Sequence, residues 1–170
     1  MIKIGYCPKG YTKETDKALT PEETVEQVIQ ALNKHGQAIL KEVRRIDTGR
    51  LDIPVYFSYY GVKAREMGVP KRQQMGKGAS PVQAKCSALM ELAERYSFFS
   101  FAANNENFTR LSWKEARSRW GEQLLPTAEI IKSVQEDISE NEADEALNLL
   151  HWRFTPALNV YAGREEYVPL

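Results

Sequence analysis

Ser87, Glu91 and Glu94 could together do chemistry, because they share one stripe of a helix predicted over 81–103. At about 100° per residue, these side chains and Gln83 fall within about 80° of the helix circumference. Two ionised carboxylates at positions i and i+3 repel each other, so in a partly buried cleft they need a cation. Magnesium prefers such hard oxygen ligands and leaves room for substrate phosphates. The spacing therefore makes Glu91 and Glu94 candidate magnesium ligands.

The alternative interpretation of this stripe is a solvated helix face. Glu91 would then pair with Arg95 at i+4, which contributes a few tenths of a kcal/mol. Apolar side chains beside the stripe favour a cleft instead, because a helix that is apolar nearly all round is usually buried. Those side chains are Cys86, Met90, Phe98 and Phe101. Lysine or arginine partners would satisfy the two carboxylates equally well, so both interpretations stay open.

The run Gly76-Lys77-Gly78 stands just before this helix. Free backbone N–H groups and the helix dipole favour an anion at such a position. The simpler interpretation is a tight strand-to-helix turn, and taken by itself the run favours that turn. The phosphate-loop pattern G-x-x-x-x-G-K-[ST] is absent, because Lys77 is followed by Gly78. Any nucleotide is therefore bound without that loop.

The elements that must position these residues predict an α+β fold, with a small, mostly antiparallel sheet packed on the long central helix 81–103. Capping boxes predict helix starts at Thr20, Ser80 and Ser112. Strands are expected over 38–46 and 53–60, and 61–79 is expected to be a connection. We expect a single domain or part of one, in three segments: 1–108 with the sheet and central helix, 109–150 with short helices near 127–137 and 142–150, and 151–170 as a strand pair.

Composition excludes several function classes. The chain has 170 residues, enough for one domain with a hydrophobic core. Lys and Arg number 23 and Asp and Glu also 23, so the net charge is zero. That balance argues against nucleic-acid binding and against a polybasic membrane anchor. No signal peptide or membrane-spanning run is visible, and two cysteines without a CxxC motif predict a reducing, cytoplasmic location.

The stretch 76–97, GKGASPVQAKCSALMELAERYS, resembles the YcaO family. The family pattern is a GKG loop followed by Ser-x-x-x-Glu-x-x-Glu-Arg on the central helix. It is matched here by Ser87, Glu91, Glu94 and Arg95. A looser match upstream places Lys17 and Thr24 at the family's nucleotide contacts near the first helix. The resemblance covers most of the chain and is dense only over 76–97.

This resemblance implies an ATP-dependent enzyme that activates a backbone amide of a peptide or protein substrate. A nucleophile adds to the carbonyl carbon, the resulting oxyanion is phosphorylated, and phosphate leaves, which yields an azoline, amidine or thioamide. The implied ATP-binding residues are Lys17, Thr24, Ser87, Glu91 and Glu94, and the implied Mg²⁺ ligands are Glu91 and Glu94. No catalytic residue is assigned.

The resemblance also implies an incomplete domain, because the family's domain is much longer and its second glutamate pair has no counterpart here. We therefore expect this chain to be the N-terminal part of such a domain, and by itself to be inactive and to bind Mg·ATP weakly or not at all. The alternative function is a non-catalytic nucleotide- or peptide-binding module of the same fold. A partner protein for substrate recognition and a homodimer are further expectations.

Overall fold

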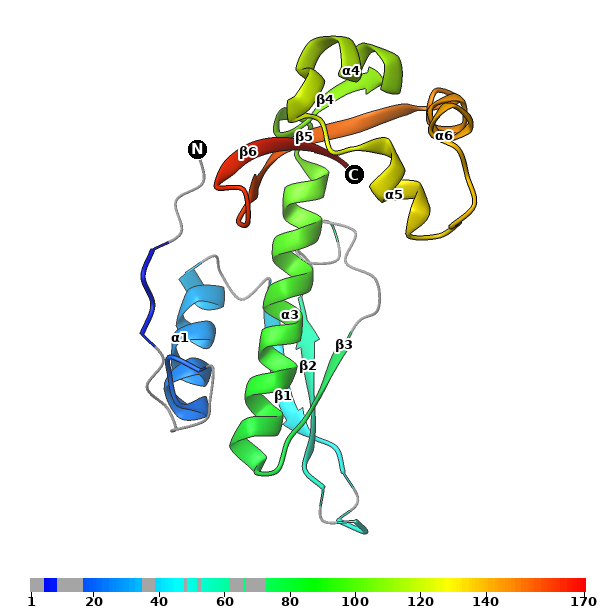
Figure 1. The fold of residues 1–170 in the computed structure, drawn as a ribbon. Helices are drawn as coiled ribbons and strands as arrows, with labels where there is room; N and C mark the ends of the chain where they lie inside the picture. The colour runs from blue at the N-terminus through cyan, green and yellow to red at the C-terminus, as the bar shows by residue number, and fades with distance from the viewer. Residues whose placement is uncertain are drawn as a thin grey trace. The chain divides into compact units, whose positions relative to one another are not determined.

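The structure is a computed structural model that describes residues 5–8, 17–34, 39–47, 49–51, 53–61, 66 and 73–170. These residues form two compact units, Tyr6–Ala103 and Asn104–Leu170 with Gly5. The elements of the first unit are α1 (Pro21–Lys34), β1 (Leu40–Arg45), β2 (Val55–Tyr60), β3 (Gln73–Lys77) and α3 (Pro81–Ala103) (Figure 1). Those of the second are η1 (Asn105–Asn107), β4 (Thr109–Ser112), α4 (Trp113–Trp120), η2 (Gly121–Gln123), α5 (Thr127–Lys132), α6 (Glu140–Leu147), β5 (His151–Asn159) and β6 (Arg164–Pro169).

The first unit is an antiparallel sheet in the order β1-β2-β3 with α3 along one face and α1 beside α3 (Figure 1). The predicted α+β class and the central helix 81–103 are confirmed. The expectation that 61–79 is only a connection is wrong, because 73–77 forms β3. Its sequence, QQMGK, has weak strand propensity. Pairing with β2, in a register that sets Tyr56 opposite Gly76, makes it a strand.

The sheet approaches α3 closely because small residues face each other across the contact. Tyr56, Ser58 and Tyr60 alternate along β2 and share one face with Gly76 of β3. A Cβ at Gly76 would lie 2.1 Å from the backbone nitrogen of Ala88 and 2.3 Å from the carbonyl oxygen of Ala84. Backbone therefore rests on backbone at this point, and only glycine fits.

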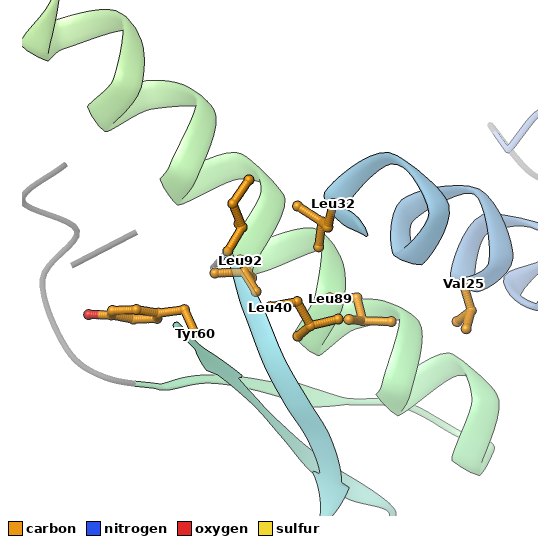
Figure 2. Packing of buried hydrophobic residues seen from close by; sticks show 7 residues of the cluster. Val25, Leu32, Leu40, Tyr60, Leu89 and Leu92 are labelled. Carbon is orange, nitrogen blue, oxygen red and sulfur yellow. The ribbon is translucent and has the colours of Figure 1, made fainter. Parts of the chain in front are cut away.

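A buried hydrogen bond and an apolar cluster complete this packing. Ser58 Oγ donates to the carbonyl oxygen of Ala88 at 2.7 Å, so the polar atom of a fully buried serine is satisfied. Figure 2 shows the cluster, to which the two helices and the first two strands contribute. Its buried members are Val25, Leu32, Ile39, Leu40, Tyr60, Leu89 and Leu92.

The predicted helix starts are borne out for two capping boxes and modified at the third. Thr20 accepts a hydrogen bond from the backbone N–H of Glu23, whose carboxylate accepts from the N–H of Thr20. Ser112 and Glu115 do the same at the start of α4. At α3, Ser80 Oγ accepts from the N–H of Gln83, but Gln83 Oε1 accepts from the N–H of Ala79. The box at α3 therefore reaches one residue further back than predicted.

The second unit is built on a second antiparallel sheet, in the order β4-β5-β6. Its core contains the fully buried Trp113 and Phe154, and the ring of Trp120 stacks on Tyr167 with centroids 4.2 Å apart. Strand β4 lies at the start of a segment expected to be helical, whereas β5 and β6 form the expected strand pair. No helix among the described residues is long and apolar enough to cross a membrane.

Gly76→Ala tests the close approach of β3 to α3. Because the added Cβ would meet helix backbone, which cannot move aside as a side chain can, we expect the free energy of unfolding to fall by about 1–3 kcal/mol or more. Urea unfolding followed by circular dichroism measures this. Gly5→Ala is the matched control, since nothing lies within 4 Å of its added Cβ, and should change stability little. Equal stability of the two variants would contradict the packing described.

Asp47 ties the end of β1 to the start of β2. Its carboxylate accepts hydrogen bonds from Arg45 Nε at 2.6 Å and from the backbone N–H groups of Val55 and Gly49, each at 3.2 Å. The hydrogen bond from Arg45, followed by that from Val55, lowers the pKa of Asp47 to about 2. The carboxylate form is therefore favoured by folding.

Asp47→Asn should lower the free energy of unfolding near neutral pH, by an amount that shrinks in acid. Because the folded-state pKa lies below the ordinary value of about 4, the stabilisation is complete above about pH 4 and is lost as the pH falls towards about 2. Urea unfolding at about pH 7 and about pH 3 measures the difference. Asp137→Asn, at an exposed carboxyl, is the control. A difference between Asp47→Asn and the parent that stays constant over this range would refute the role of the Asp47 charge.

Candidate functional site

A pocket of about 500 Å³ opens where α1 and α3 begin and β3 ends. The segment before α1 and its first turn contribute one side, the end of β3 contributes the second, and α3 contributes the third. The lining residues are Lys17, Leu19, Pro21, Thr24, Lys77, Gly78, Gln83, Cys86, Ser87 and Met90. All belong to the first unit, so its sheet and two helices form the pocket without the second unit.

The structure brings together three of the residues assigned to ATP. Lys17, Thr24 and Ser87 all line this pocket, although the chain separates the first two from the third by more than sixty positions. Thr24 lies in the first turn of α1, where its hydroxyl donates to the carbonyl oxygen of Thr20 at 2.9 Å. The capping box at Thr20 fixes this turn. Because α1 packs on α3, the turn lies beside the part of α3 that contains Ser87.

Glu91 and Glu94 are not among the lining residues. Helix geometry places them about 6 Å and about 10 Å beyond Ser87 along α3, so they continue its stripe away from the pocket. Glu94 is exposed. The ion pair of the alternative interpretation is present, because Arg95 Nε donates to Glu91 Oε1 at 3.0 Å. With side chains 34% and 45% exposed, this pair contributes little to stability.

Cys86 lines the pocket together with Lys17, from the segment before α1, and Thr24, from the first turn of α1. Burial raises the pKa of the Cys86 thiol, and the charge of Glu22 acts in the same direction. The Thr24 hydroxyl and the Lys17 ammonium oppose that shift, so both act on the thiol from the pocket side. A cation, a hydroxyl and a thiol therefore share one small volume.

Sequence analysis missed several pocket residues. Lys77 belongs to the run that by itself favoured a plain turn, and Gln83 lies on the polar stripe without an assigned role. Cys86 and Met90 were counted only as apolar neighbours of the stripe. Lys77 could have been found by following the suggestion of an anion site. The other three depend on which side of α3 meets α1, which is a tertiary feature.

The lining suits a nucleotide. Lys17 and Lys77 provide ammonium groups and Ser87 provides a hydroxyl, from which phosphate oxygens can accept hydrogen bonds. The Thr24 hydroxyl, which donates to the carbonyl oxygen of Thr20, would have to turn to join them. Leu19 and Met90 add apolar surface of the kind that a base packs against. For Mg²⁺, Glu91 and Glu94 offer a carboxylate pair, and no cluster of three or more acidic, histidine or cysteine side chains able to hold a metal occurs among the described residues. Bound phosphates and water would have to supply the remaining ligands.

A larger and shallower groove lies elsewhere in the first unit. It measures about 620 Å³ and runs between α1, the start of α3 and Tyr56. Glu22, Glu26 and Lys85 form its charged rim, and Val25 and Val82 are part of its apolar floor. None of the residues assigned from the sequence lines this groove, so the smaller pocket is the candidate site.

Comparison with known families shows to which family the chain belongs. Residues 75–170 match a family model described as YcaO cyclodehydratase, ATP- and Mg²⁺-binding. The chain belongs to the YcaO family. The matched residues include the last three residues of β3, the whole of α3 and the second unit from Asn104 onward. The family description also confirms ATP and Mg²⁺ as the ligands expected of YcaO proteins.

Solved structures share the fold. A heterocyclase in complex with substrate and cofactor is 19% identical and has a TM-score of 0.62 over 99% of this chain and 24% of its own. YcaO from Methanopyrus kandleri bound with AMPPCP and Mg²⁺ is 17% identical and has a TM-score of 0.51 over 89% of this chain and 32% of its own. This chain thus spans about a quarter to a third of their length. Among curated proteins, none was found to match this sequence.

Thiol modification tests the environment of the YcaO pocket. Because the thiolate is the reactive form and burial raises the pKa of Cys86, we expect iodoacetamide at about pH 8 to modify the exposed Cys7 several-fold faster than Cys86. Mass spectrometry of peptides from timed reactions measures both rates. In urea the two rates should become similar. Faster modification of Cys86 in the folded chain would contradict its placement in the pocket wall.

Proposed function

We propose that this chain contributes the nucleotide-binding side of an ATP-dependent enzyme that modifies a peptide backbone. The observation that carries the proposal is the meeting of Lys17, Thr24 and Ser87 in one pocket. ATP would supply the phosphoryl group that turns an amide-derived oxyanion into a leaving group, as in azoline, amidine or thioamide formation. The substrate would be a peptide or protein, as the resemblance to the YcaO family implies.

The side chains of the pocket would hold the triphosphate by charge and by hydrogen bonds. Lys17 and Lys77 approach from different elements, so their ammonium groups can neutralise phosphates from two sides. The hydroxyl of Ser87 would donate to a phosphate oxygen, and that of Thr24 would do so after leaving the carbonyl oxygen of Thr20. Positioning and charge neutralisation of this kind account for most of the catalysis of phosphoryl transfer.

Glu91 and Glu94 would hold Mg²⁺ on α3, beyond the pocket residue Ser87. They follow Ser87 on the same stripe of α3, and a cation held by them would supply positive charge to neutralise phosphates. Arg95 now occupies Oε1 of Glu91, whereas Oε2 of Glu91 makes no hydrogen bond within the described part of the chain. A metal would therefore compete with Arg95 for one oxygen and find the other open.

This chain by itself should bind Mg·ATP weakly. It spans 24% and 32% of the two structures compared, and the candidate Mg²⁺ ligands on it are a single carboxylate pair. Half a metal cage leaves charge on the triphosphate uncompensated. We infer that residues outside this chain supply the remaining metal ligands and the substrate contacts. A partner protein or a second copy of the chain would contribute to substrate recognition, and the location would be cytoplasmic.

The second candidate function is a non-catalytic nucleotide- or peptide-binding module of the same fold. The Glu91–Arg95 ion pair favours it, since a carboxylate that serves only the helix surface needs no metal. Dependence of nucleotide binding on Mg²⁺ would favour the enzyme. Phosphate release in the presence of peptide, by a longer protein that carries this chain, would separate the two functions.

A nucleotide titration tests the assignment of the pocket and the metal ligands. We expect ATP at up to about 20 mM to shift the NMR signals of Lys17, Thr24 and Ser87, with Mg²⁺ raising the affinity about tenfold, or ~1.4 kcal/mol. Glu91→Gln with Glu94→Gln should abolish the gain from Mg²⁺ but keep binding of free ATP. Glu136→Gln with Glu145→Gln, at two exposed positions, is the charge-matched control.

Two outcomes would contradict the proposal separately. No ATP-dependent shift at these pocket residues would remove the nucleotide site. A Mg²⁺ effect that survives loss of both carboxylates would remove the metal ligands but leave the nucleotide site. As an independent readout, AMPPCP should protect Cys86, but not Cys7, from iodoacetamide.

A further inference from the structure

Gln83 joins the candidate pocket to the turn between β3 and α3. Its Oε1 accepts a hydrogen bond from the backbone N–H of Ala79 at 3.1 Å, and its own backbone N–H donates to Ser80 Oγ at 3.3 Å. Gly78 lies against its stem, since a Cβ there would be 2.6 Å from Gln83 Cβ. The side chain is therefore held near its base by the turn and at its oxygen by Ala79.

This arrangement fixes which way the amide group of Gln83 faces. A backbone N–H can donate only to an acceptor, so the amide oxygen and not the nitrogen must face Ala79. The Nε2 group, with its two N–H donors, is then at the other end of the amide. Among the described residues, none accepts a hydrogen bond from it.

The two N–H donors of Gln83 Nε2 could donate to a ligand in the pocket. Gln83 is half-buried and lines it together with Lys17, Lys77 and Ser87. It also lies one turn of α3 before Ser87, on the same stripe, so both side chains reach the same side of the helix. The lysines attract an anion, and a neutral amide adds direction without adding charge. An amide already held by its oxygen loses little freedom when its nitrogen donates to a ligand.

We propose that Gln83 is a further nucleotide-binding residue, whose Nε2 donates to a phosphate oxygen. This inference rests on the proposed function of the pocket. It assigns the two ends of one side chain to different tasks: the oxygen orders the turn and the nitrogen binds the ligand. Loss of the nitrogen alone should therefore weaken nucleotide binding without loosening the turn.

Three variants of the 170-residue chain separate these tasks. Gln83→Met removes both ends, so it should lower the midpoint of urea unfolding and weaken ATP binding roughly tenfold, as expected for a hydrogen bond to a charged group. Gln83→Glu keeps an acceptor for Ala79 but replaces the donors by negative charge. It should keep the stability of the parent and bind ATP more weakly than Gln83→Met. Ser80→Ala removes the other hydrogen bond of the turn and does not line the pocket, so it should lower stability and keep parental affinity.

ATP affinities from NMR titration and urea midpoints decide between the outcomes. Parental affinity in Gln83→Met would overturn the proposal while leaving the nucleotide pocket intact. A loss of affinity in Ser80→Ala as large as that in Gln83→Met would also overturn it, because order in the turn would then be the cause. If the parent chain shows no ATP-dependent shift at up to about 20 mM, the proposed function fails and this inference fails with it.

Discussion

The first unit depends on one close contact, in which the backbone of β3 at Gly76 lies on α3 at Ala84 and Ala88. Packing at this distance leaves no room for a side chain between strand and helix. It requires glycine on β3, alanines on α3 and, on the neighbouring strand β2, the small residue Ser58, whose hydroxyl donates to the carbonyl oxygen of Ala88. A larger residue at any of these positions would push α3 away from the sheet.

The candidate pocket follows from this contact. The end of β3 and the N-terminal half of α3 form two of its sides, and their separation is set by Gly76 and Gly78. The third side, around Lys17 and Thr24, is held by the apolar cluster between α1 and α3. The GKG run is thus a structural requirement first. Lys77 lines the pocket because Gly76 and Gly78 allow the end of β3 to lie directly against the start of α3.

Charge divides the stripe on α3 into two parts. Gln83 and Ser87 lie at the pocket, whose nearby cations come from other elements, whereas Glu91 and Glu94 lie further along the helix near solvent. A surface ion pair with Arg95 is a weak competitor for a divalent cation. The same residues therefore fit a solvated helix face in the isolated chain and, in the function we propose, a metal site when phosphates are bound. Membership of the YcaO family favours the second.

Local patterns in the sequence were sufficient for the central helix, whereas the short helices expected near 127–137 and 142–150 lie at Thr127–Lys132 and Glu140–Leu147. The capping residues and apolar spacing placed α3 at Pro81–Ala103, because caps and side-chain periodicity act within a few residues of chain. Helical spacing singled out Ser87, but its ATP role and the assignment of Lys17 and Thr24 came from the family resemblance, since spacing alone cannot bring residues so far apart together. Only the tertiary structure decided that 73–77 is a strand, that Gln83 bonds to Ala79, and that Lys77 and Cys86 line the pocket. Each of these depends on pairing with β2 or on packing between α1 and α3, which are contacts between distant segments that no local pattern encodes.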